Sequence, residues 1–116
     1  MFLIAAINYA NCLNELKRHK EARSVLRKKI PVARRVLGES HDVTLKMRCI
    51  YAMSLYSDPA ATLDDLREAV TTLEETEQTA RRVLGAAHPL TGGMGESLQA
   101  ARAKLRARET PSPGSA

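Results

Sequence analysis

The stretch Arg-Arg-Val-Leu-Gly at residues 34–38 returns unchanged at residues 81–85, 47 positions along the chain (34 to 81). The match extends on both sides without a shift, from Glu-Ala at 21–22 and 68–69 to a histidine three residues after each glycine. Internal repetition at a spacing of roughly 20 to 50 residues is typical of stacked supersecondary units. The chain therefore contains at least two copies of one structural unit.

A second register refines the length of that unit. Tyr-Ala at residues 9–10, followed by Leu13, returns at residues 51–52, followed by Leu55, which is 42 positions along the chain (9 to 51). The two registers differ by five residues, which places an insertion, Ser-Asp-Pro-Ala-Ala at residues 57–61, in the turn of the second unit. The basic unit is 42 residues long, and the second copy carries this insertion.

Apolar residues recur at three- and four-residue steps between the breaks, which predicts helices. Gly38 and Gly85 are suitable residues to end a helix, Asp42 is a plausible N-cap, and Pro31 should kink or break the helix that contains it. Five helices are expected, over about residues 2–16, 20–37, 42–56, from 58 or 62 to 84, and from 90 or 94 to 106. The fifth helix should cover the open end of the stack, as terminal capping elements do.

Composition agrees with a helical protein. Hydrophobic residues make up 44% of the 116 residues, but aromatic residues make up only 3% and there is no Trp. A core built mainly from Ala, Leu and Val suits close helix packing better than it suits sheets. The length leaves room for one domain. We expect a helical domain over residues 1–109 and a disordered tail over residues 110–116, which is rich in Pro, Ser and Gly.

Charge is distributed unevenly along the chain. Residues 17–35 carry nine Lys or Arg and one acid, whereas residues 58–77 carry seven acids and one Arg, and the formal net charge is +5. A chain with both a basic and an acidic third is not a simple polyanion binder. The candidate basic patch is Lys17, Arg18, Lys20, Arg23, Arg27 and Lys28. It could be a solvated helix face that pairs with the fourth helix, a site for an acidic protein, or, less favoured because no aromatic side chains interleave it, a nucleic-acid surface.

The candidates for chemistry are few. His41 and His88 are equivalent by repeat and lie in links between helices, so we expect structural roles; His19 lies in the basic run and should be solvated. Cys12 and Cys49 have no metal-ligand spacing, and we expect two buried free thiols in a reducing compartment. No catalytic, metal-binding or phosphate-binding motif is present. We expect no enzymatic activity, no metal and no cofactor.

The chain shows no targeting or membrane signal. No stretch reaches the ~20 apolar residues that a membrane span needs. Residues 1–6 are apolar, but they lack the basic flank and cleavage site of a signal peptide. A soluble, cytoplasmic protein without membrane contact is therefore expected.

The unit resembles the tetratricopeptide repeat, specifically the 42-residue kind found in kinesin light chains. The resemblance rests on Asn-Tyr-Ala-Asn-Cys-Leu at residues 8–13, the small Ala22, the link at residues 34–42 and His-Pro at residues 88–89, and it covers about residues 4–106. It implies an all-α fold of antiparallel helix hairpins stacked as a short right-handed solenoid of about two and a half repeats. It also implies a non-catalytic protein–protein interaction module, or scaffold, that binds a peptide or a partner subunit in its concave groove. The chain departs from the repeat pattern at Ile50, at Lys29 and around residues 92–95.

By the same resemblance, the first helix of each pair lines the groove. The groove residues are then Asn8, Asn11, Asn14, Lys46 and Ile50. Asparagine can donate to and accept from the backbone of an extended peptide, and a lysine can meet an acid.

The first helix suggests an alternative role. It opens with the apolar residues Phe2 to Ala6 and has no polar cap before it, so this segment could dock the chain into a larger assembly or onto a second copy. The alternative function is therefore a structural subunit held through its first helix.

Overall fold

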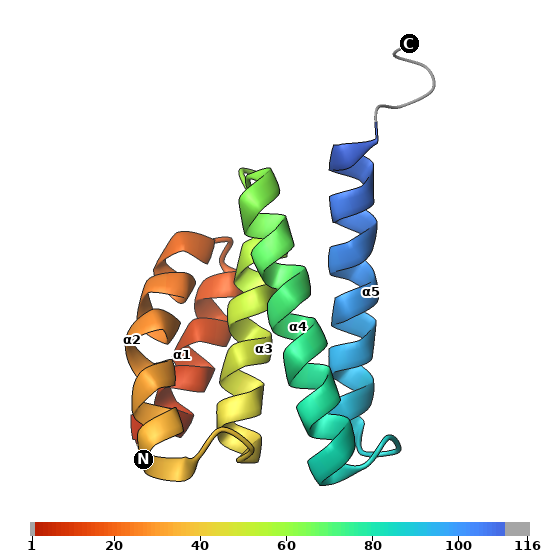
Figure 1. Cartoon of the computed structure of the whole chain (residues 1–116). Helices are drawn as coiled ribbons and strands as arrows, with labels where there is room; N and C mark the ends of the chain where they lie inside the picture. Colours follow the sequence, from red (N-terminus) through yellow and green to blue (C-terminus); the bar gives the residue numbers. More distant parts are fainter. Residues whose placement is uncertain (1, 111–116) are drawn as a thin grey trace.

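The computed structural model describes residues 2–110, and the side chain of Phe2 lies outside that description. The described chain is all α-helical, without strands. The five helices are α1 (Phe2–Glu15), α2 (His19–Leu37), α3 (Asp42–Tyr56), α4 (Leu63–Leu84) and α5 (Pro89–Glu109). Consecutive helices run antiparallel, up and down across the molecule (Figure 1). The predicted all-α class and the five helices are confirmed for these residues. Of the tail expected at residues 110–116, all but Thr110 lies outside the described residues.

The helices form two layers. Each helix packs on the next along the chain, and in addition α1 contacts α3 and α3 contacts α5, whereas α2 and α4 do not contact each other. The helices α1, α3 and α5 therefore share one layer, and α2 and α4 form the other. Because α3 packs against all four other helices, it carries more buried residues than any of them, including Leu45, Met47 and Leu55.

The two links that follow the repeated Arg-Arg-Val-Leu-Gly stretch have the same backbone structure. Gly38 and Gly85 end α2 and α4 with φ of 98° and 93°, a conformation that favours glycine. Three residues later, His41 and His88 precede the next helix, and the Nδ1 atom of each accepts a hydrogen bond of 3.1 Å from a backbone N–H two residues on. The histidines are thus N-caps, which confirms their structural role. The prediction of Asp42 as the cap is wrong by one residue, because the His41 ring supplies the acceptor.

The start of α4 resolves two competing signals. Thr62 is the N-cap, and it forms a capping box with Asp65, with bonds of 3.1 and 3.0 Å in the two directions. Asp58, the earlier candidate, instead accepts from the backbone N–H of Ala60 in the preceding turn. The reciprocal cap satisfies the backbone N–H groups of both Thr62 and Asp65, so α4 begins after Thr62 and not after Asp58. The fifth helix begins earlier than its glycines suggested, with Pro89 in its first turn.

Pro31 does not break α2. The helix continues through it to Leu37. Pro31 is exposed, whereas Ile30 and Ala33 beside it are buried in the core. Proline inside a helix costs about 3 kcal/mol, and we attribute the continuity to this packing on both sides of the proline.

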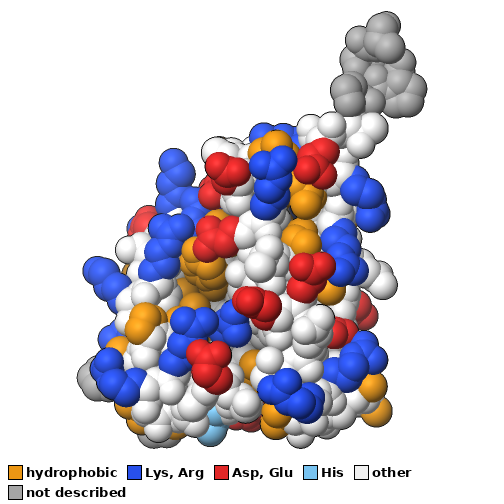
Figure 2. Space-filling model, in the orientation of Figure 1, with side chains coloured by type: hydrophobic (Ala, Val, Ile, Leu, Met, Phe, Trp, Pro, Cys, Tyr) orange, Lys and Arg blue, Asp and Glu red, His pale blue; other side chains and the backbone are white. Residues whose placement is uncertain are grey.

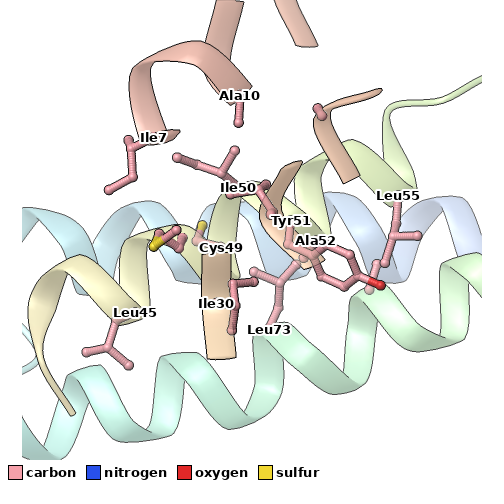
Figure 3. Close-up of a cluster of buried hydrophobic side chains, with 14 of the residues drawn as sticks. Ile7, Ala10, Ile30, Leu45, Cys49, Ile50, Tyr51, Ala52, Leu55 and Leu73 are labelled. Atoms are coloured by element: carbon pink, nitrogen blue, oxygen red, sulfur yellow. The ribbon is translucent and has the colours of Figure 1, made fainter. Parts of the chain in front are cut away.

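Fully buried alanines lie where the helices approach closely. Ala10, Ala22, Ala52 and Ala69, one from each of α1 to α4, are all 0% exposed. Around them the larger apolar side chains of several helices meet in one cluster, in which Ile50 of α3 lies next to the α1 side chains (Figure 3). A side chain larger than alanine at these positions would push the helices apart.

The two cysteines differ. Cys49 is buried in the core, but Cys12 is exposed, so the expectation of two buried thiols is wrong for Cys12. Burial raises the pKa of the Cys49 thiol. The exposure of Cys12 arises because it lies on the side of α1 that no other described element covers.

Candidate functional site

A groove runs over the layer formed by α1, α3 and α5. It consists of two adjoining hollows of about 500 and 340 Å³, which share Lys46, Pro89 and Leu90 as lining residues. Asn8 of α1 lines the larger hollow and Asn11 of α1 lines the smaller one. Three of the five groove residues predicted from the sequence, Asn8, Asn11 and Lys46, therefore lie on one continuous surface.

These three polar side chains are available to a ligand. Within the described residues, none of them makes a hydrogen bond or an ion pair with another part of the chain. Apolar side chains surround them, among them Ile4 of α1 and Val43 of α3. The carboxylate of Asp42 and the ring of His88 also line the larger hollow, so the groove combines an apolar wall with two amides, one ammonium group, one carboxylate and one imidazole.

The other two predicted groove residues are placed differently. Ile50 is only 4% exposed and lies under the smaller hollow, near Ile7 and Ala10 of α1 (Figure 3). Asn14 does not line the groove, because its Oδ1 atom accepts from Nδ1 of His19 at 2.9 Å. Ile50 therefore contributes to the floor, and Asn14 contributes to the joint between α1 and α2.

Sequence reasoning missed the contribution of α5. Its Leu90, Gly93 and Ser97 line the smaller hollow opposite α1. A Cβ atom added at Gly93 would meet nothing within 4 Å, so packing within the chain does not require glycine there. The sequence offered one signal for this contribution, the three glycines at positions 92, 93 and 95. From the sequence they indicated only a weak first turn of the helix.

His19 is not solvated. It is 5% exposed, and its Nε2 atom and the Nδ2 atom of Asn14 are buried without a hydrogen-bond partner in the described structure. Burial lowers the pKa of His19, although the charge of Asp58 opposes that shift. The expectation that His19 is solvated was wrong because His19 faces inward, although its neighbours in the sequence are basic and exposed.

The candidate basic patch does not form a single free surface. Arg23 is buried; it donates to the carbonyl oxygen of Ser54 at 2.8 Å and lies 3.3 Å from Asp58. Arg18 pairs with Glu21 at 2.7 Å, and Arg27 donates to the hydroxyl of Tyr51 at 3.2 Å. Lys17, Lys20 and Lys28 are exposed. Half of the six residues thus have partners within the chain.

The basic and acidic thirds of the chain face each other across a furrow. Seen from the side of α2 and α4, Lys and Arg side chains lie over α2, and Asp and Glu side chains lie over α4 (Figure 2). Between the two helices the hydroxyl of Tyr51 bridges them, since it accepts from Arg27 and donates to Glu68. Burial and the bond to Glu68 raise the pKa of Tyr51. The furrow, of about 240 Å³, is lined by charges that are already paired in part.

Between residues 2 and 110, no three His, Cys, Asp or Glu side chains are placed to hold a metal ion. Over the same residues, no helix combines the length and the apolar character needed to cross a bilayer. No protein-family model, curated protein or solved structure matches the chain.

Proposed function

We propose that this chain is a non-catalytic protein-binding module that holds an extended peptide of a partner protein in the groove over α1, α3 and α5. The observation that carries the proposal is the groove itself, in which Asn8, Asn11 and Lys46 lie unengaged among apolar side chains. Asparagine side chains can bind a peptide backbone in both directions, and the lysine provides a partner for an acidic side chain or a C-terminal carboxylate.

The arrangement of the helices supports reading the chain as a short right-handed tetratricopeptide-like solenoid of about two and a half repeats. The two links after Gly38 and Gly85 have the same geometry. The contacts of α1 with α3 and of α3 with α5 are those of first helices in successive hairpins. Such a stack presents its first helices together on one side, which is the side that carries the groove.

Nucleic-acid binding is the weaker candidate. Of the basic patch, Arg18, Arg23 and Arg27 already have partners within the chain. Phosphate binding would require these side chains to exchange an internal partner for an external one, which reduces the gain from each contact.

The peptide proposal is tested with a displayed library of random 12-residue peptides selected against the full chain. The enriched peptides should carry an acidic residue or a free C-terminal carboxylate. Asn11→Ala and Lys46→Ala should each weaken their binding by about fivefold to tenfold, which corresponds to ~1 kcal/mol. The variants should keep the helical circular dichroism of the original protein, since Lys46 is exposed and Asn11 is at the surface.

Lys20→Ala is the matched control, because Lys20 is also exposed and basic but lies on α2, away from the groove. It should leave peptide binding unchanged. Peptides that bind Asn11→Ala and Lys46→Ala as tightly as the original chain would contradict the groove proposal. Loss of binding in Lys20→Ala, together with a steep dependence on salt, would favour the basic surface instead.

A further inference from the structure

Three positions that are buried in α3 are exposed at their repeat equivalents in α1. Tyr51 of α3 is 8% exposed, whereas Tyr9 of α1, its equivalent 42 residues earlier, is 54% exposed. Met47 and Ser54 are both 0% exposed, whereas their equivalents Ala5 and Cys12 are exposed. The face that α3 buries is therefore repeated on α1, where the described chain does not cover it.

The second hairpin shows how this face is covered. There α2 lies against it: Ile30 packs into the core cluster, and Arg27 donates to the Tyr51 hydroxyl. Arg23 bonds to the carbonyl oxygen of Ser54 and pairs with Asp58. The cover is thus a single amphipathic helix with an apolar stripe and flanking arginines.

The first hairpin has an open hollow at the matching place. It measures about 380 Å³ and lies between α1 and α2, lined by Tyr9 and Ala6 on one side and by Val25 and Lys28 on the other. The furrow beside α3 is lined by Tyr51, Arg48 and Thr72, which are the repeat equivalents of Tyr9, Ala6 and Val25. The lining of the hollow beside α1 is mainly apolar, whereas the lining of the furrow beside α3 is more polar.

Two differences between the hairpins define the chemistry of the missing cover. Lys28 stands where the second hairpin has Glu75, which pairs with Arg48 of α3, so the charge beside the uncovered face is positive and the cover should carry an acid there. The turn of the first hairpin lacks the insertion that supplies Asp58, the partner of Arg23, and exposes 63% of Leu16, so the cover should carry an apolar residue at that point. For the placement of the covering helix, the packing of α2 against α3 is the template.

We propose that one face, made by Tyr9 and Cys12 of α1, Leu16 in the turn after it, and Val25 and Lys28 of α2, binds an amphipathic helix of a partner protein; this face is here named the end face. That helix lies on α1 as α2 lies on α3. It places apolar side chains over Tyr9 and Leu16 and an acidic side chain over Lys28. The end face and the groove are separate surfaces, so this proposal does not rest on peptide binding in the groove.

The end face also revises which part of α1 would dock. The sequence pointed to Phe2 to Ala6, but Ala6 is 7% exposed and belongs to the core, and the side chain of Phe2 lies outside the described residues. The exposed apolar residues of this face follow a helical stripe that begins at Ala5, continues at Tyr9 and Cys12 of α1, and ends at Leu16 in the turn after the helix. Docking therefore involves the whole length of the helix.

A second copy of the chain fits the end face less well than an acidic helix. Two end faces brought together about a two-fold axis would juxtapose basic faces, because each carries Lys28. The acidic helix of a second copy, α4, exposes mostly polar residues, such as Asp64, Glu68 and Glu75, and offers no apolar stripe. Charge thus favours a different partner.

A synthetic helix derived from the template tests the proposal. The probe is a labelled, end-blocked peptide with the sequence of residues 19–37 that carries Arg23→Leu and Arg34→Glu; the reference peptide has the unmodified sequence. Arg34 is changed because it lines the furrow beside Arg48, the equivalent of Ala6 next to Lys28. Fluorescence anisotropy with the full chain should show the probe binding at least about fivefold more tightly than the reference, as one matched charge pair and one apolar contact would give.

Variants of the chain make the result specific. Tyr9→Asp should abolish binding of the probe, and Lys28→Glu should reverse the preference in favour of the reference peptide. Both residues are exposed, so circular dichroism should be unchanged. Lys46→Ala, in the groove, should leave probe binding intact, which separates this proposal from the peptide-binding function.

Three results would overturn the proposal. One is equal affinity of the two peptides for the chain, and another is probe binding that survives Tyr9→Asp. The third is a concentration-dependent dimer, seen by light scattering, that Tyr9→Asp dissociates, because it would assign the end face to a second copy.

Discussion

Arg23 of α2 and Asp58, in the turn after α3, form an ion pair with nitrogen and oxygen 3.3 Å apart, and both side chains are about one-tenth exposed. The same guanidinium donates to the carbonyl oxygen of Ser54. The pKa of Asp58 is lowered, first by the hydrogen bond from the backbone N–H of Ala60 and then by Arg23. The five-residue insertion therefore supplies the carboxylate that anchors the two hairpins to each other.

Arg23→Ala should destabilise the fold by about 3 kcal/mol, because it leaves the carboxylate of Asp58 and the carbonyl of Ser54 without their partner. Urea unfolding followed by circular dichroism measures this change. Lys20→Ala, an exposed cation on the same helix, serves as the control and should stay within about 0.5 kcal/mol of the original chain. A change in Arg23→Ala as small as in the control would show that the pair contributes little.

The two equivalent tyrosines should differ in their contribution to stability. Tyr51→Ala removes a buried ring and its hydrogen bonds to Arg27 and Glu68, so we expect a loss of about 3 kcal/mol or more. Tyr9→Ala removes a ring that is more than half exposed, and the loss should be below about 1 kcal/mol. Equal losses, measured by urea unfolding at the same protein concentration, would mean that something covers Tyr9 in solution.

The helices and their ends could be predicted where the signal is local. Gly38 and Gly85 end their helices with a positive φ, and the tolerance of glycine for that conformation can be read from the residue type alone. At the start of α4 two local signals competed, and Thr62 prevailed because Asp65 completes its cap from both sides. Pro31 does not break α2, the stronger of the two outcomes expected, because the packing of its neighbours is not visible in the local sequence.

The candidate site was harder to predict, since burial depends on partners distant in the sequence. His19 and Asn14 looked like surface polar residues, but they bond to each other in the joint between α1 and α2. Conversely, Cys12 looked buried because its helix is apolar on more than one side. Neither the charge pattern nor the spacing of apolar residues predicted that α5 lines the groove, because the lining includes Gly93, which has no side chain.

Stability should depend on pH through His19. Its folded-state pKa lies below the ordinary value of 6.5, mainly because burial disfavours the charged ring. The unfolded chain therefore takes up the proton first, and stability is at its full value above about pH 6.5. It decreases as the pH falls below 6.5 towards the lowered folded-state pKa, with a slope of at most about 1.4 kcal/mol per pH unit.

Urea midpoints measured from pH 7.5 down to pH 5 test this dependence. His19→Gln cannot be protonated, so its stability should change less over that range, even if its stability at pH 7.5 is lower. Asp58 also has a lowered pKa, but its contribution is lost only at more acidic pH, around and below its ordinary value of 3.8. An unchanged slope in His19→Gln would assign the pH dependence to other groups.

Two glycines, one in the α4–α5 link and one inside α5, should respond to alanine in opposite directions. Gly93 lies inside α5 with open space around its Cα, so Gly93→Ala should stabilise the fold by about 0.5 to 1 kcal/mol. Gly85 has a φ of 93° and ψ of 154°, a region that other residues rarely occupy, so Gly85→Ala should destabilise by about 1 to 3 kcal/mol. Thermal or urea unfolding of the two variants gives the sign of each change in stability.

Because Gly93 lines the groove, the stabilised Gly93→Ala variant should also bind groove-selected peptides less tightly. A gain in stability with unchanged binding would show that the ligand does not approach α5 at this point.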